Sequence, residues 1–227
     1  VVSRTYLVKE KPDAILNIID GTNIERNLYL TTQLLEMGIP VVAALNMMDI
    51  VKKRGDVIDV KKLSKELGVT VVETAAIKGE GTKELVEAAK KAAKEGKAPA
   101  RIKFSDTVEN AVNEIEKLIA DVTEPAQRHW FAVKLFERDD KVMDELKLSS
   151  DLIAHIDQHI KDCEAEMDDD AESIITNQRY AYINTVVGKA VKKKARVEHL
   201  TVSDKIDQIV TNRILALPIF ALVMFLM

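Results

Sequence analysis

Two polar side chains follow directly after a short apolar run, in the tetrapeptide Asn46-Met47-Met48-Asp49. The run at 41–45 has the length and β-branched start of a buried parallel strand, and α/β folds bind ligands where such strands end. A carboxylate at Asp49 can accept two parallel hydrogen bonds from the N1–H and the exocyclic amine of guanine, whereas adenine offers no donor at N1. Asn46 can brace the loop and reach the imidazole edge of the purine, with the base lying against the thioether of Met47. The spacing predicts a guanine-reading loop, although Asn and Asp also finish strands and cap helices.

A second candidate loop lies further along the chain. After a helical stretch at 60–67, the apolar run 69–72 predicts another strand, and small residues follow it. These residues are Thr74, Ala75 and Ala76. Small side chains at a strand end let a backbone N–H approach the O6 atom of guanine closely. We therefore expect this loop to make the second contact with the base.

These loops, together with residues 20–30 and 78–81, resemble the G domain of the ferrous iron transport protein B family, FeoB. Family members typically carry Asn-Met-Met-Asp or Asn-Met-Leu-Asp here, so Met47 is a family trait. Ala75 and Ile77 replace the usual Ser and Lys of the second loop, so the resemblance carries over only its backbone contribution. The resemblance continues through 203–207, 212–213 and 217–220, which are similar to the segment that leads into the first membrane helix.

The resemblance implies a GTP-binding and GTP-hydrolysing membrane transporter of ferrous iron. It implies GTP or GDP and Mg²⁺ as cofactors, and a helical domain that steadies bound GDP in the manner of a guanine-nucleotide dissociation inhibitor. It further implies small accessory transport proteins and a homo-oligomer as partners. The location implied is the cell (inner) membrane, with this segment on the cytoplasmic side.

A phosphate-binding motif is missing from the sequence. Gly-x-x-x-x-Gly-Lys-[Ser/Thr] does not occur, and the pairs Gly96-Lys97 and Gly188-Lys189 lack the glycine spacing and the hydroxyl residue. Mg²⁺ ligation and attack on the γ-phosphate would need residues that in the family lie upstream of Val1, so we expect no catalytic residue here. The chain opens without Met and stops at Met227 inside an apolar run, which predicts a fragment cut at both ends.

Two alternatives remain open. The first is a non-catalytic, membrane-tethered scaffold with a degenerate G domain. The second is a different membrane-bound GTPase, against which the match at 203–220 argues.

Composition limits the class of protein. With 227 residues, of which 47% are hydrophobic, the chain has apolar material for two modest cores, so we expect two domains. The net charge of −4 argues against nucleic acid as a partner, because no basic excess can neutralise phosphates. Cys163 is the single cysteine, so no internal disulfide can form, and a reducing compartment fits.

The first part of the chain alternates between strands and helices. Apolar bursts of strand length at 14–19, 41–45 and 69–72 are separated by helical stretches such as 24–37 and 82–94. This pattern predicts a parallel α/β sheet over residues 1–98, and the resemblance implies that it is part of a P-loop GTPase-type sheet. A complete G domain has about six strands, so three strands would leave an exposed sheet edge.

Residues 99–211 show helical periodicity only, which predicts an all-α helical domain. His155, His159 and Cys163 repeat every four residues, but three ligands on consecutive turns of one helix rarely converge on one ion. The acidic run at 164–172 lacks the alternating ligands and central Gly of a calcium loop. We therefore expect no metal site in this segment.

The segment 214–227 has no charged residue, and we expect the start of a transmembrane helix over 212–227. It is shorter than the ~20 residues that span a bilayer, so a buried C-terminal helix is the alternative. Basic residues at 192–196 and Arg213 would place its amino side in the cytoplasm, near membrane lipid.

Overall fold

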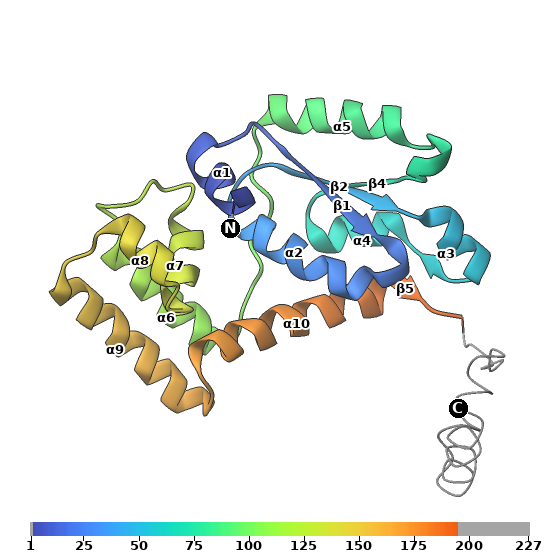
Figure 1. The fold of residues 1–227 in the computed structure, drawn as a ribbon. Coiled ribbons are helices and arrows are strands. Elements are labelled where there is room, and N and C mark those ends of the chain that lie inside the picture. Colours follow the sequence, from blue (N-terminus) through green and yellow to red (C-terminus); the bar gives the residue numbers. More distant parts are fainter. Residues whose placement is uncertain (1, 195–227) are drawn as a thin grey trace, which may run out of the picture. The chain divides into compact units, whose positions relative to one another are not determined.

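The structure of this chain, a computed structural model, describes residues 2–194 (Figure 1). Residues up to Lys193 form one compact unit. Its first half alternates helices and strands: α1 Val2–Glu10, β1 Ile15–Asp20, α2 Ile24–Glu36, β2 Val41–Asn46, α3 Met48–Arg54, β3 Val57–Ile58, α4 Val60–Leu67, β4 Thr70–Glu73 and α5 Thr82–Glu95. Two 3₁₀ helices, η1 Gly21–Asn23 and η2 Ala76–Lys78, follow β1 and β4.

Three parallel strands form the main sheet, in the order β1-β2-β4. The predicted strands and the long helices between them are confirmed, with bounds that differ by one residue or so. Helix α5 covers one face of the sheet, and α2 and α4 cover the other (Figure 1). Strand β2 is buried on both faces, which explains why its sequence is an uninterrupted apolar run.

Strand β1 is covered on one face only. Asn17 and Ile19 are buried, whereas Leu16 and Ile18 are 41% and 64% exposed. Their register partners Val42 and Ala44 on β2 are buried. In the described residues β1 is also a terminal strand of the sheet, so the exposed edge that the sequence predicts is present, and β1 leaves apolar side chains uncovered on one face.

A second, two-stranded sheet was not predicted. Strand β3 pairs antiparallel with β5, Val191–Lys192, at the end of the helical half. The amide of Asp59 donates to the carbonyl of Ala190 at 2.8 Å beside this pair. A two-residue strand leaves no periodic signal in the sequence, so local pattern could not find it.

The second half of the unit contains five helices in the described residues: α6 Asp106–Leu118, α7 Arg128–Phe136, α8 Asp140–Leu146, α9 Ser150–Met167 and α10 Ala171–Ala190. The predicted change to helix is confirmed. Apolar side chains of α6, α7, α9 and α10 share one core, with Ile115, Phe136, Ile160 and Ile183 at 2% exposure or less. The aromatic pair Trp130 and Phe131 lies in this core.

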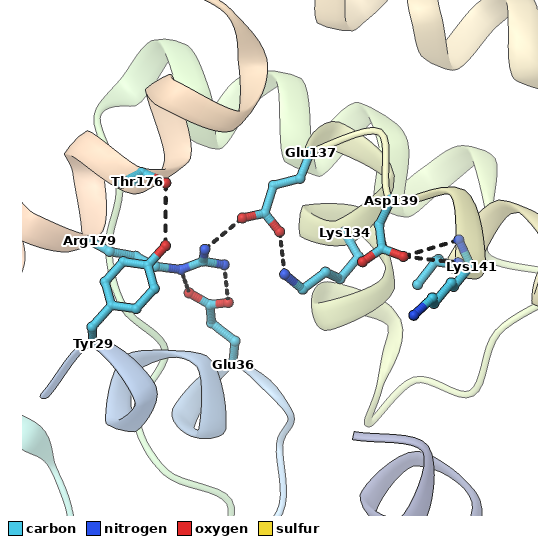
Figure 2. Close-up of polar contacts among 9 residues, drawn as sticks. Tyr29, Glu36, Lys134, Glu137, Asp139, Lys141, Thr176 and Arg179 are labelled. Atoms are coloured by element: carbon cyan, nitrogen blue, oxygen red, sulfur yellow. Dashed lines mark hydrogen bonds and ion pairs between the residues drawn. The ribbon is translucent and has the colours of Figure 1, made fainter. Parts of the chain in front are cut away.

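Arg179 of α10 is fully buried and joins the two halves. Its Nε and Nη2 atoms donate to the two carboxylate oxygens of Glu36 on α2 at 2.9 and 2.7 Å. Its Nη1 donates to Glu137 at the end of α7 at 2.6 Å, and Lys134 donates to the other oxygen of Glu137 (Figure 2). Tyr29 of α2 and Thr176 of α10 share a hydrogen bond beside this cluster (Figure 2).

The buried cluster balances two cations against two carboxylates. Burial alone would lower the pKa of Arg179, but the hydrogen bonds and charge of Glu36 and the charge of Glu137 outweigh it and raise the pKa. The paired hydrogen bonds between the guanidinium and the carboxylate of Glu36 replace the hydrogen bonds to water that Arg179 loses on burial. The cluster therefore fixes α2, α7 and α10 relative to one another.

No helix among residues 2–194 is long and apolar enough to cross a membrane. The predicted transmembrane start at 212–227, and the matched residues 203–220, lie outside the described residues.

Replacing Arg179 by Met should strongly destabilise the protein. The substitution leaves the carboxylate of Glu36 buried without its cation, which costs about 3–5 kcal/mol. Urea unfolding followed by the fluorescence of Trp130, the single tryptophan, measures the loss.

The matched control is Arg138→Met. Arg138 also pairs with two carboxylates, those of Asp157 and Glu164, but its side chain is 38% exposed. A surface network of this kind is worth about 1 kcal/mol or less. Equal losses in the two variants would contradict the role assigned to Arg179.

A second prediction concerns the turn between η2 and α5. Gly79 and Gly81 both have positive φ, +70° and +76°, so alanine pays about 1 kcal/mol at either site. At Gly81 an added Cβ would also lie 2.0 Å from the carbonyl oxygen of Glu73, whereas at Gly79 it would meet open space. Gly81→Ala should therefore cost roughly 1–3 kcal/mol more than Gly79→Ala in urea unfolding. Equal losses of unfolding free energy in the two variants would show that the backbone adjusts around the Cβ at position 81 and would contradict this prediction.

Candidate functional site

The two predicted loops meet at the carboxyl edge of the sheet. Asn46 is the last residue of β2, and the register places Leu45 beside Glu73, the last residue of β4. The amide of Thr74 donates to the carbonyl of Leu45 at 2.8 Å, and the amide of Met48 donates to the carbonyl of Thr74 at 3.3 Å. Backbone hydrogen bonds therefore continue past the strand ends and hold one loop against the other.

Asn46 braces the second loop, as its place at the strand end predicts. Its Oδ1 accepts a hydrogen bond from the amide of Ala76 at 3.1 Å and a longer one from Thr74 Oγ1 at 3.4 Å. Both bonds use Oδ1, so Nδ2 is the group that can donate to a purine ring nitrogen.

The backbone amides of the second loop are bonded within the protein in this structure. The small residues were expected to offer a backbone N–H to a base, but the Ala76 amide already donates to Asn46 in this structure. The amide of Ala75 likewise donates to Glu80 at 3.1 Å. Thr74 and Ala75 are buried, so they support the loop from within, and only Ala76 of the three lies at the surface.

The two methionines of the first loop have different positions. Met47 adopts a left-handed conformation, with φ 60° and ψ 28°, and its carbonyl accepts the first amides of α3 from Ile50 and Val51. Its side chain is 37% exposed and can lie against a ligand. Met48, which is among the predicted contacts, is 4% exposed and its side chain packs in the core, so a contact with a base would come from its backbone.

Asp49 lies in the first turn of α3 with its side chain 30% exposed. The ammonium of Lys78, on η2, lies 3.0 Å from its Oδ2 atom. The hydrogen bond from Lys78 is the main reason that the pKa of Asp49 is below its ordinary value. Asp49 is therefore a carboxylate at neutral pH, and it can accept two N–H donors from a ligand that presents them side by side.

A third strand end adjoins this edge. Asp20 ends β1 opposite Asn46, and its carboxylate accepts from the amide and hydroxyl of Thr22 at 2.8 and 2.7 Å. Burial would raise the pKa of Asp20, but the hydrogen bonds from Thr22 and Asn23 lower it overall. A Cβ on Gly21 would lie 3.0 Å from the carbonyl oxygen of Asn46, so the close approach of the two strand ends favours glycine here.

The histidines and cysteine of α9 lie away from this edge. His155 is exposed, His159 is partly buried and Cys163 is buried on the same helix. Within residues 2–194, no three His, Cys, Asp or Glu side chains are grouped so as to hold a metal ion.

Sequence reasoning missed the role of two lysines. Lys78 pairs with Asp49 across the loops, and Lys52 of α3 pairs with Glu73 of β4 at 2.8 Å. Both pairs join residues more than twenty positions apart, so no local spacing reveals them. The only available signal for Lys78 was its place in a loop that resembles a known family.

Comparison with known proteins supports the family resemblance that the loops indicate. Residues 1–89 match the family model described as ferrous iron transport protein B, and residues 104–192 match the model described as the FeoB cytosolic helical domain. The gap between the two matches, residues 90–103, covers the end of α5 and most of the segment that leads to α6.

Full-length relatives are considerably longer than this chain. An Fe(2+) transport protein A/Fe(2+) transporter FeoB fusion protein of Porphyromonas gingivalis is 39% identical over 99% of the chain, and the Fe(2+) transporter FeoB of Escherichia coli is 33% identical over 98%. The chain spans 28% of the length of each of these relatives.

Solved structures of NFeoB from S. thermophilus share the fold. A point mutant bound to GDP is 41% identical, with a TM-score of 0.81 over 84% of this chain and 74% of that one. The mGMPPNP-bound protein is 40% identical, with a TM-score of 0.79 over 87% of this chain and 74% of that one. From these matches and the shared architecture, the chain belongs to the ferrous iron transport protein B (FeoB) family.

Proposed function

We propose that this chain supplies guanine recognition and a regulatory helical domain to a GTP-binding, GTP-hydrolysing membrane transporter of ferrous iron. The observation that carries the proposal is the edge where Asn46 braces the second loop beside the ionised carboxylate of Asp49. The similar solved structures of NFeoB contain bound GDP or mGMPPNP, which supports a guanine nucleotide at this edge.

Each side chain at the edge has a proposed part. Asp49 accepts the N1–H and the exocyclic amine of guanine, and Asn46 donates from Nδ2 to the imidazole edge. Met47 provides an apolar surface for the base. Met48, Thr74 and Ala75 act through backbone position, because their side chains are buried. Ala76 holds the second loop in place through its bond to Asn46.

The sheet fits a larger G domain. Leu16 and Ile18 leave apolar surface uncovered on β1, on the face where β2 is covered by α5. We propose that residues 1–98 are the carboxyl-terminal part of a G domain, and that the phosphate loop, Mg²⁺ ligands and catalytic residues lie outside this chain. Residues 99–211 would form the helical domain, and 212–227 the start of a membrane helix.

The intact protein would use GTP to control the passage of Fe(II). Its partners would then be guanine nucleotide, Fe(II) and membrane lipid, with this segment on the cytoplasmic side of the cell membrane. The fusion of transport protein A to the Porphyromonas gingivalis relative supports a small accessory transport protein as a further partner. The buried Arg179 cluster is the contact through which the helical domain would sense α2 of the G domain.

Asp49→Asn in the intact protein should reverse the preference between guanine and xanthine nucleotides. The amide oxygen can still accept the N1–H of either base, but the amide NH₂ would face the exocyclic amine of guanine, whereas it can donate to the C2 carbonyl of xanthine. We expect GDP binding to weaken roughly tenfold or more, because a site built to pair with a polar group discriminates strongly when the pairing fails. Competition between GDP and XDP at equilibrium measures the change.

Asn46→Ala is the matched control at the same edge. It removes the bond to Ala76 and loosens the second loop, so it should weaken GDP and XDP binding together. A full guanine preference in Asp49→Asn would contradict the assignment of Asp49 as the base-reading group. A scaffold without nucleotide binding would show no preference in any variant.

A further inference from the structure

Lys78 lies on the second loop and reaches the carboxylate of the first. Its Nζ lies 3.0 Å from Oδ2 of Asp49, and the two side chains are 53% and 30% exposed. The ion pair therefore occupies the group that contacts the base in the proposed function.

A base and an ammonium compete for this carboxylate. Guanine presents two parallel donors and needs both oxygens of Asp49, and Lys78 already occupies Oδ2. The ammonium also neutralises the charge that would attract the donor edge of the base. Without nucleotide, the carboxylate of Asp49 is thus paired with Lys78 of the protein itself.

The ion pair is not needed to hold the loops together. Asn46 Oδ1 bonds the amide of Ala76, and the backbones of Leu45, Met48 and Thr74 are bonded across the same edge. Removing the Lys78 side chain leaves all of these bonds intact.

The Lys78 side chain has room to leave Asp49 without moving its loop. The amide of Lys78 is fixed by the carbonyl of Ala75 at 2.8 Å. The neighbouring Ile77 is 98% exposed, and a Cβ on Gly79 would meet no heavy atom within 4 Å. An exposed ion pair is weak, so a ligand with two donors can displace it.

We propose that Lys78 is a gate on the base site, and that guanine displaces its ammonium from Oδ2 of Asp49 as the nucleotide binds. The inference rests on the proposed function and adds a specific determinant of how fast the nucleotide enters. It assigns to Lys78 a role in the association step, and leaves the bound complex without a contact from its ammonium to Oδ2.

The test compares wild type with Lys78→Met in the intact protein. Stopped-flow mixing with a GDP that carries a fluorescent group on its ribose measures association and dissociation separately. Association should be roughly two- to fivefold faster in the variant at low salt, with dissociation unchanged, because the competing ion pair is gone. The ratio of the two association rates should approach one at high salt, since salt screens the ion pair in wild type.

Three further variants show whether the effect belongs to Asp49. Lys78→Arg keeps a cation and should bind at nearly the wild-type rate. Lys52→Met removes the ion pair with Glu73, which joins α3 to β4 without touching Asp49, and should leave the association rate unchanged. In an Asp49→Asn background, Lys78→Met should add no acceleration, because the carboxylate that it competes for is absent.

The outcomes separate the gate from the proposed function. Slower or unchanged association in Lys78→Met, or equal acceleration in Lys52→Met, overturns the gate while guanine binding by wild type stands. A wild-type protein without preference for guanine overturns the proposed function and the gate with it.

Discussion

Parallel pairing of β1, β2 and β4 is the constraint on which the candidate site depends. Parallel strands bring their carboxyl ends to one edge, so Asp20, Asn46 and Glu73 end side by side although they are far apart in the sequence. The loop after β2 then lies against the loop after β4, and Asn46 needs only its short side chain to bond Ala76. A slip in register would separate Asp49 from Lys78 and remove the polar edge altogether.

The buried guanidinium of Arg179 connects the half that contains the sheet to the helical half. A surface ion pair would hold the two halves loosely, but Arg179 loses its hydration and must keep Glu36 and Glu137 in place. Helix α2 starts just after Asp20 at the ligand edge and ends at Glu36 in the cluster. One helix therefore runs from the candidate site to the contact with α10, where Arg179 also holds Glu137 at the end of α7 (Figures 1 and 2).

Local sequence pattern predicted the parts of the fold that depend on burial of regular elements. The run at 41–45 is apolar because β2 is covered on both faces, and that signal needs no knowledge of partners. The same reasoning identified the loop residues Asn46 and Asp49, because a predicted strand also predicts where its following loop begins. It could not show that the side chain of Met48 is buried, because the direction of a side chain after a strand depends on the left-handed turn at Met47.

Long-range polar contacts could not be predicted in this way. Arg179 is separated from Glu36 by 143 positions, and nothing in the sequence distinguishes it from a solvated arginine of an amphipathic helix. The ion pair of Lys78 with Asp49 could not be predicted for the same reason, and neither could the pairing of β3 with β5. Each contact depends on a partner that is distant in the sequence. The family resemblance identified the loop that contains Lys78 but not its bond to Asp49.

We propose that the edge beside Asp49 recognises guanine through the two N–H donors of the base. The most direct test measures the equilibrium affinity of the intact, unmodified protein for GDP, IDP and ADP under one set of conditions. Hypoxanthine keeps the N1–H but lacks the exocyclic amine, and adenine lacks a donor at N1. If Asp49 reads both donors, GDP binds most tightly, IDP more weakly and ADP most weakly. Binding of ADP as tight as that of GDP would contradict it.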